Sequence, residues 1–373
     1  MPALLSPESL ADALRIRDLT DPREGPHALQ LLVDAAMTSL ADTWRCEVRI
    51  SRSRPIVPVE DNYERLRYSP DAVTRDARYT RYVSETCVLR SHTSALIPPA
   101  LRTLAVNPAG DVLLACPGLV YRRDSIDRLH SATPHQLDLW RVTQQRRLGD
   151  DDLHAMVDLV LGATLPDRAW RWTPAQHPYT TSGRQIDVWY EGDWVEVGEC
   201  GLAAQAVLSE AGLDAGTTSG LALGVGLDRL LMIRKGLPDI RLLRSTDPRV
   251  SDQLCDLSPW RPVSRHPPVL RDISVAVSSG STGEEIGDRV REALGPDSDA
   301  IEDVTVLAHT SYDELPPTAV DRLGLEPHQE NVLIRIVLRD LHRTLTSAEA
   351  NDLRDRIWAA IDEGVSLAST TRR

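Results

Sequence analysis

Hydrophobic positions repeat with two different periods along this chain, which indicates a mixture of helices and strands. Residues 28–44 carry apolar side chains three and four positions apart, so we predict an amphipathic helix packed on a core. Short segments elsewhere before residue 258 alternate apolar and polar residues, a pattern typical of strands. The pattern therefore predicts an α+β protein.

A proline-rich segment divides the chain into two parts. Residues 256–268, DLSPWRPVSRHPP, contain four Pro in 13 positions. Proline continues neither a helix nor a central strand, so this segment is typical of a linker. We expect a large domain at 1–258, a linker at 259–268 and a small domain at 269–373.

The small domain shows its own order of patterns. A strand is followed by a helix, two strands and a final helix, which predicts an α+β sandwich with an antiparallel sheet. Thr346 and Glu349 are spaced as a capping box, so we expect the last helix to begin at this point.

Composition narrows the class of protein. The net charge of −13 argues against indiscriminate binding to nucleic acid. The part of the chain from residue 262 onward is itself acidic, since it contains 12 Arg and 20 Asp and Glu residues. Five scattered Cys show no ligand spacing, which argues against structural zinc and disulfides. No apolar run is long enough to cross a membrane, and the N-terminus lacks a signal-peptide pattern. We therefore expect a cytoplasmic protein with no membrane partner.

Residues 111–142 hold the clearest candidate chemistry. An apolar strand leads to Arg122 and Asp124, a charged loop follows, and a return strand carries Gln136 and Asp138. Alternate side chains of a hairpin share a face, so each of these two pairs should lie on one side. A guanidinium beside hydrogen-bond acceptors suits a phosphate held next to an amine or hydroxyl substrate.

This hairpin resembles motif 2 of class II aminoacyl-tRNA synthetases, in the form found in phenylalanyl-tRNA synthetases. Further segments are similar to that family in the same order: motif 1 at 53–66, the Leu-Arg-x-His-Thr-Ser segment at 88–95, the Phe-Pro-Phe to Gly-Cys-Gly segment at 170–201, and motif 3 at 219–243. The C-terminal part resembles the family's ferredoxin-fold anticodon-binding domain. Together they resemble the single-chain, mitochondrial-type arrangement.

The resemblance implies a class II catalytic domain, with an antiparallel sheet flanked by helices, followed by a ferredoxin-like sandwich. It implies that ATP and Mg²⁺ convert an amino acid, Phe or an analogue, into an aminoacyl-adenylate, whose acyl group passes to tRNA. The implied catalytic residues are Arg122, Arg229 and Glu196, with Glu196 also the Mg²⁺ ligand. The implied ATP contacts are Arg122, Asp124, His130, Glu196, Gly226 and Arg229.

The family's remaining contacts also transfer position by position. The implied amino-acid contacts are His92, Ser94, Gln136, Asp138, His177, Tyr179, Cys200, Ala222 and Gly224. The implied tRNA contacts are Arg335, Arg339 and Arg343. Because the single-chain members work as monomers, we expect a monomer.

Several positions depart from the family. His177 and Tyr179 replace two family Phe, in a chain that contains no Phe at all. Ile97 stands for a Gln, Asp138 for a Glu, and Glu199 for a Gly. Two alternatives to a tRNA ligase of the phenylalanyl type therefore stay open: a paralogue that adenylates another amino acid for biosynthesis without tRNA, and a non-catalytic binding or regulatory paralogue.

Overall fold

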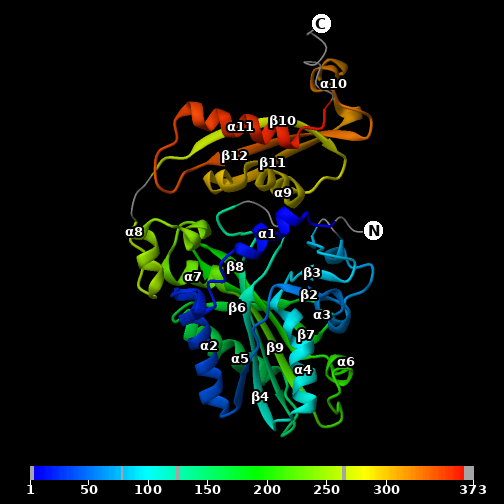
Figure 1. Ribbon diagram of the computed structural model, residues 1–373, viewed down its shortest axis with the longest axis vertical. Helices are drawn as coiled ribbons and strands as arrows, with labels where there is room; N and C mark the ends of the chain where they lie inside the picture. Colours follow the sequence, from blue (N-terminus) through cyan, green and yellow to red (C-terminus); the bar gives the residue numbers. More distant parts are fainter. Residues whose placement is uncertain (1–3, 77–78, 123–126, 263–265, 365–373) are drawn as a thin grey trace. The chain divides into compact units, whose positions relative to one another are not determined.

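The computed structural model describes residues 4–76, 79–122, 127–262 and 266–364. The chain divides into two compact units (Figure 1). The first unit comprises residues up to 122, 133–238 and 251–260; the second comprises 123–132, 239–250 and 261 onward. In the part of the chain that is described, no helix has both the length and the apolar character needed to cross a membrane.

A seven-stranded sheet forms the centre of the first unit. Its strands, from one edge to the other, are β1 (Glu47–Ile50), β4 (Asp111–Leu119), β5 (His135–Thr143), β9 (Ser219–Gly226), β8 (Asp193–Ala203), β7 (Thr180–Tyr190) and β6 (Trp170–Pro174). Only the β1–β4 pair is parallel. A short second sheet pairs β2 (Ile56–Pro58) with β3 (Cys87–Leu89). The predicted antiparallel sheet is thus confirmed.

Helices flank this sheet, as predicted. The helix expected at 28–44 is confirmed as α2 (Ala28–Trp44), which packs on α5 (Asp150–Thr164) and α7 (Leu227–Lys235). Within the first unit, α2 lies on one side of the sheet and α4 (Ile97–Val106) on the other (Figure 1). The other helices of this unit are α1 (Pro7–Arg15), α3 (Val59–Asn62) and α6 (Gln205–Glu210), whereas α8 (Pro248–Ser251) begins in the second unit.

Aromatic and aliphatic side chains join α4 and α6 to the sheet. Leu101 and Leu104 of α4 share a buried cluster with Val207 of α6 and with Trp140 and Ala222 of the sheet. This cluster fills one end of the sheet face on α4's side. The polar residues of β5 lie beyond it on the same face.

The second unit contains a smaller sheet in the order β10-β12-β11, antiparallel throughout. Its elements are β10 (Val269–Ser278), α9 (Gly283–Leu294), β11 (Ile301–Ser311), α10 (Pro317–Leu323), β12 (Gln329–Leu338) and α11 (Ser347–Ile361). This is the split β-α-β arrangement of ferredoxin-like folds. Helices α9 and α11 supply the apolar side chains that cover it.

Local sequence signals agree with this unit. Thr346 and Glu349 form the predicted capping box at the start of α11, where the Glu349 amide donates to Thr346 Oγ1 over 3.3 Å. The described residues of the 256–268 segment form no helix or strand. The hydrophobic pattern did not indicate α10, and it did not indicate that residues 239–250 would cluster with the second unit.

The only Lys in the chain anchors the start of the linker to the first unit. The ammonium group of Lys235 is buried and donates to the Asp256 and Ser258 carbonyl oxygens over 2.9 and 2.6 Å. It also contacts the Asp256 carboxylate at 3.1 Å. A buried ammonium is stable only when its donors are satisfied, and here three acceptors satisfy them.

Candidate functional site

Neighbouring strands β5 and β9 form the floor of the candidate site. Their register places Asp138 opposite Gly224 and Gln136 opposite Gly226. Directly opposite residues of an antiparallel pair point to the same face. Glycine therefore leaves the two polar side chains uncovered on that side, and the nearest heavy atom to a Cβ at Gly224 would be Asp138 Oδ2, at 3.5 Å.

A β-bulge in β8 brings two more carboxylates to this face. Glu199 pairs with Gln185 of β7, whereas Glu196 pairs with Asp187, so the four residues 196–199 of β8 lie opposite the three residues 185–187 of β7. The extra residue reverses the alternation, and Glu196 therefore shares a face with Glu199. Without the bulge, residues three apart would point to opposite faces.

Two arginines approach Glu196. Arg229, in the first turn of α7, donates from Nη1 to the Glu196 carbonyl oxygen over 2.5 Å. Desolvation raises the pKa of Glu196; the positive charges of Arg229 and Arg122 oppose this rise, and Glu199 adds to it. Arg122 is exposed just beyond β4. Its charge also acts on His92, so both guanidinium groups border the same site.

Asp138 is the most deeply buried carboxylate of the site. Ser94 Oγ donates to it over 2.8 Å, Thr93 Oγ1 over 3.2 Å and Trp140 Nε1 over 3.2 Å. Burial outweighs these hydrogen bonds and raises the pKa of Asp138 to about 6, from the usual 3.8. Gln136 is fixed by the Thr93 amide, which donates to its Oε1 over 3.1 Å.

Aromatic rings line the same region. Trp140 stacks with Tyr179 and Tyr179 with His177, at centroid distances of 6.2 and 5.8 Å. Tyr68 stacks on His92 at 5.7 Å and lies 6.2 Å from Tyr179. These five residues form what we call the aromatic cluster, and Ala222 lies opposite Trp140 in the sheet register.

The two histidines of the aromatic cluster have buried ring nitrogens. The His177 Nε2 atom is buried and lies 3.0 Å from a carboxylate oxygen of Glu199. Both ring nitrogens of His92 are buried without a hydrogen-bond partner. Burial, together with the nearby Arg122 charge, lowers the pKa of His92 to about 4, so this imidazole is neutral near pH 7.

The structure brings together most of the predicted amino-acid contacts, but not Cys200. Cys200 pairs with Leu223, whereas the neighbouring pair on the face with Trp140 is Gly201 with Ala222. Because successive residues of a strand alternate, Cys200 points to the opposite face. Desolvation there raises the pKa of its thiol to about 12. The prediction that Cys200 lines the amino-acid site is therefore wrong.

Two of the predicted ATP contacts do not lie among the described residues of the first unit. Asp124 lies outside the described residues. His130 belongs to the second unit, where its Nδ1 lies 2.6 Å from Asp127 Oδ2. Gly226 lies at the end of β9, directly before α7.

The three arginines predicted to contact tRNA are all paired with carboxylates of their own unit. Arg335 makes a bidentate pair with Asp272, at 2.9 and 2.8 Å. Arg339 pairs with Glu302, and Arg343 with Glu349 at 2.8 Å. Any phosphate must compete with these acids.

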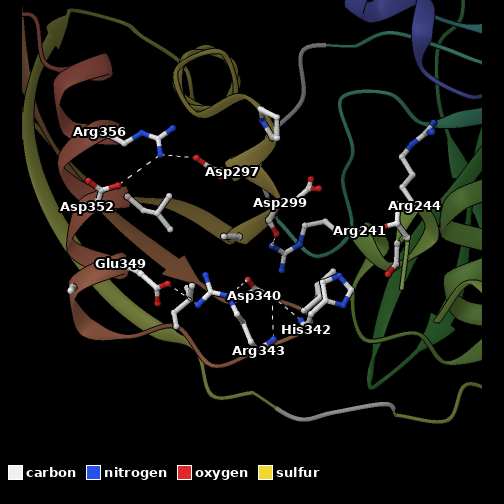
Figure 2. A pocket seen from close by; sticks show the side chains of 18 residues that line it. Arg241, Arg244, Asp297, Asp299, Asp340, His342, Arg343, Glu349, Asp352 and Arg356 are labelled. Atoms are coloured by element: carbon white, nitrogen blue, oxygen red, sulfur yellow. Dashed lines mark hydrogen bonds and ion pairs between the residues drawn. The ribbon is translucent and has the colours of Figure 1, made fainter. Parts of the chain in front are cut away.

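A cavity of about 640 Å³ also lies within the second unit (Figure 2). Figure 2 shows Arg343 directed toward Glu349, and Arg356 directed toward Asp297 and Asp352. Four arginines and five acids line this cavity. Because the opposite charges are paired, the cavity lacks the excess positive charge of a phosphate site.

Sequence reasoning missed several residues that hold the site. Trp140, Thr93 and Tyr68 contact predicted site residues, yet a lone Trp, Thr or Tyr has no motif signal. The position of Thr93 between the predicted contacts His92 and Ser94 could have indicated that it belongs to the site. Among the described residues there is no group of three His, Cys, Asp or Glu arranged to hold a metal ion.

Comparisons with known proteins agree with this geometry. The model of the class II core domain of tRNA synthetases (F) matches residues 44–254. The chloroplastic/mitochondrial phenylalanine–tRNA ligase of Arabidopsis thaliana is 31% identical over 326 residues, which is 84% of this chain and 71% of the relative. The mitochondrial phenylalanine–tRNA ligase of Saccharomyces cerevisiae is 25% identical, over 91% of this chain and 86% of the relative.

Other relatives match about half of the chain. The phenylalanine–tRNA ligase alpha subunit of Prochlorococcus marinus (strain NATL2A) is 36% identical over 192 residues, 52% of this chain and 56% of the relative. The relatives that match most of the chain are named chloroplastic/mitochondrial or mitochondrial. These names contradict the cytoplasmic location predicted from the sequence.

The burial of Asp138 predicts a pH-dependent stability. Between about pH 4 and 6 the unfolded chain loses this proton while the folded chain keeps it, so the free energy of unfolding should fall by up to about 3 kcal/mol as pH rises. Asp138→Asn has no carboxyl proton to lose. Denaturant unfolding of both proteins at pH 4 and 7 should show the variant gaining stability relative to the wild type at pH 7. An equal difference at both pH values would contradict the assignment.

Proposed function

This chain belongs to the class II tRNA synthetases, in the family of the phenylalanine–tRNA ligases, and we propose that it activates an aromatic amino acid with ATP and transfers it to tRNA. The observation that carries this proposal is that the charges of Arg122 and Arg229 both act on Glu196, which shares the sheet face of Asp138. Two cations suit a polyphosphate, and a buried carboxylate suits an ammonium group.

The first step needs positioning more than covalent catalysis. The amino-acid carboxylate attacks the α-phosphate of ATP in line, the bond to the leaving pyrophosphate breaks, and an aminoacyl-adenylate results. Arg122 and Arg229 would hold the phosphates and stabilise the charge that develops on their oxygens. In the second step a ribose hydroxyl of the tRNA 3′ end attacks the activated carbonyl, and AMP leaves.

Asp138 would receive the α-ammonium group of the amino acid. An opposite charge at hydrogen-bond distance lowers the pKa of a carboxyl, which offsets the rise caused by burial. Binding would then favour the ionised form of Asp138 at neutral pH. The neutral His92 and the fixed amide of Gln136 would offer hydrogen bonds to the rest of the amino-acid backbone.

Glu196 fits a role at Mg²⁺. The ion prefers oxygen ligands, and in phosphate-transfer sites it is commonly held by one or two carboxylates together with substrate phosphates. When bound, it would neutralise phosphate charge during the displacement. Glu196 supplies one such oxygen ligand beside Arg229, and it keeps that position through the β8 bulge.

The alternatives are less well supported. The relatives that match over most of the chain are named tRNA ligases. This does not favour an adenylating paralogue that acts without tRNA. The presence of Arg122, Arg229 and Glu196 around one site argues against a non-catalytic paralogue.

Loss of either arginine should abolish activation. We expect Arg122→Ala and Arg229→Ala each to lower amino-acid-dependent ATP–pyrophosphate exchange by about 10²- to 10³-fold, because each removes a cation from the developing charge. Arg335→Ala, in the second unit, is the matched control and should leave exchange unchanged. Normal exchange in either active-site variant would remove the phosphate-binding assignment.

The contact between His177 and Glu199 should influence which aromatic ring is accepted. A polar pair at the aromatic cluster disfavours a ring that offers it no hydrogen bond. We expect His177→Phe and Glu199→Gly each to raise kcat/KM for Phe relative to Tyr by about tenfold in the exchange assay. Cys200→Ala, on the same strand as Glu199 but the opposite face, is the control. Unchanged ratios in both variants would show that the pair does not select the ring.

We propose that the second unit contributes to tRNA binding by a monomer, through arginines that its own acids now neutralise. Asp272→Asn releases Arg335 from its bidentate pair and should raise kcat/KM for tRNA charging about threefold, more at low salt than at high salt. Arg335→Ala should lower it, and neither change should alter exchange. If releasing Arg335 leaves charging unaffected at every salt concentration, this arginine does not contact tRNA.

A further inference from the structure

The segment formed by residues 4–25, which we call the N-terminal strap, lies before the 44–254 region matched by the core-domain model. It contains α1 and a short 3₁₀ turn at Pro22–Glu24. Neither the sequence motifs nor the predicted site included any part of it. Its contacts nevertheless converge on the chain just before Arg122 and just before Arg229.

The strap holds the end of β4, from which Arg122 emerges. Tyr121, the residue before Arg122, is buried, and its hydroxyl donates to the Ala13 carbonyl oxygen of α1 over 2.8 Å. Leu119 ends β4, and its amide donates to Asp18 Oδ2 over 3.1 Å. These two bonds fix the chain at one and three positions before Arg122.

Apolar packing supports these hydrogen bonds. Ala13, Leu119 and Tyr121 belong to one buried cluster, against which Leu10 and Ile16 of the strap pack. The strap therefore buries the side chains next to the β4 end, and its removal would expose them to water.

The strap also reaches the beginning of α7 through His135. The Leu19 amide donates to His135 Nε2 over 3.1 Å, in a fully buried position. Because Nε2 accepts this bond, the ring proton of a neutral imidazole lies on Nδ1. Nδ1 then donates to Asp228, at 3.0 Å from Oδ1, and Asp228 directly precedes Arg229.

We propose that the N-terminal strap is a positioning element for the two phosphate-binding arginines. Through Tyr121 and Leu119 it fixes the chain at Arg122, and through His135 and Asp228 it fixes the chain at Arg229. A guanidinium held in place before the substrate arrives loses less conformational entropy on binding. The inference rests on the proposed function, because it assigns the strap to ATP binding at that site.

Two conservative changes test the strap. Tyr121→Phe removes one hydroxyl and keeps the ring, and His135→Asn keeps a donor toward Asp228 but loses the acceptor for Leu19. Each should raise the KM for ATP in pyrophosphate exchange about fivefold, the effect expected for one lost buried hydrogen bond. For Tyr121→Phe, the KM for the amino acid should stay within about twofold, because Asp138 and Ser94 do not contact the strap.

Ser6→Ala is the matched control within the strap. Ser6 caps α1 by accepting the Ser9 amide over 3.1 Å, and no atom of it contacts β4 or His135 among the bonds described. Its loss should lower Tm and leave the KM for ATP unchanged. Tm is measured for all variants, and Tyr121→Phe remains informative if His135→Asn fails to fold.

The outcomes separate the two proposals. A wild-type protein without exchange on any aromatic amino acid would overturn the proposed function itself. An active wild type, with Tyr121→Phe showing a lower Tm but an unaltered KM for ATP, would overturn the positioning role and leave the strap a purely structural element. A raised KM for ATP in Tyr121→Phe, with Ser6→Ala unchanged, supports the positioning role.

Discussion

The buried contact between His135 and Asp228 is the interaction on which the arrangement of the first unit depends. His135 begins β5, whose next residues include Gln136 and Asp138, and Asp228 lies in the first turn of α7, which also carries Arg229. One pair of side chains thus joins the strand that would hold the amino acid to the helix that would hold the phosphates. Such a pair is stable in the interior because every polar atom of the imidazole has a partner.

Glycines and a β-bulge in the neighbouring strands bring the other site residues to the same face of the sheet. Glycines on β9 keep the face beside β5 free of side chains, and the β8 bulge turns Glu196 onto that face. Bulges are a known way to redirect a side chain beside an active site. The aromatic cluster closes the other end without any Phe, since Trp, Tyr and His provide all of its rings. A regular sheet of the same strands would not gather these groups.

Periodicity and local capping were enough to predict much of the fold. The α2 helix, the strands of the second unit and the capping box at Thr346 follow from signals within a few residues of each other. Site residues were harder, as Cys200 and Glu196 illustrate. They are four apart on β8, so simple alternation places them on one face, and only the bulge separates them. A bulge depends on the register with a neighbouring strand, which the sequence of β8 alone does not specify.

The ion-pair partners of charged side chains were predicted least well, because they depend on tertiary contacts. Arg335, Arg339 and Arg343 form a basic group in the sequence, yet Arg335 and Arg339 pair with carboxylates on other strands of the same unit, and Arg343 pairs with Glu349 of the helix that follows. Likewise, the contact of His177 with Glu199 joins residues 22 positions apart through the β7–β8 pairing. Residue types near one another in sequence do not reveal such partners.

The central claim is that one face of the sheet binds an aminoacyl-adenylate. Its most direct test is a crystal structure with a non-hydrolysable adenylate analogue that carries an aromatic amino acid. The account predicts the phosphate mimic between Arg122 and Arg229, the ammonium group within hydrogen-bond distance of Asp138, and the ring against Trp140 and Tyr179. An analogue that does not bind, or that binds with its ammonium group away from Asp138, would contradict the account.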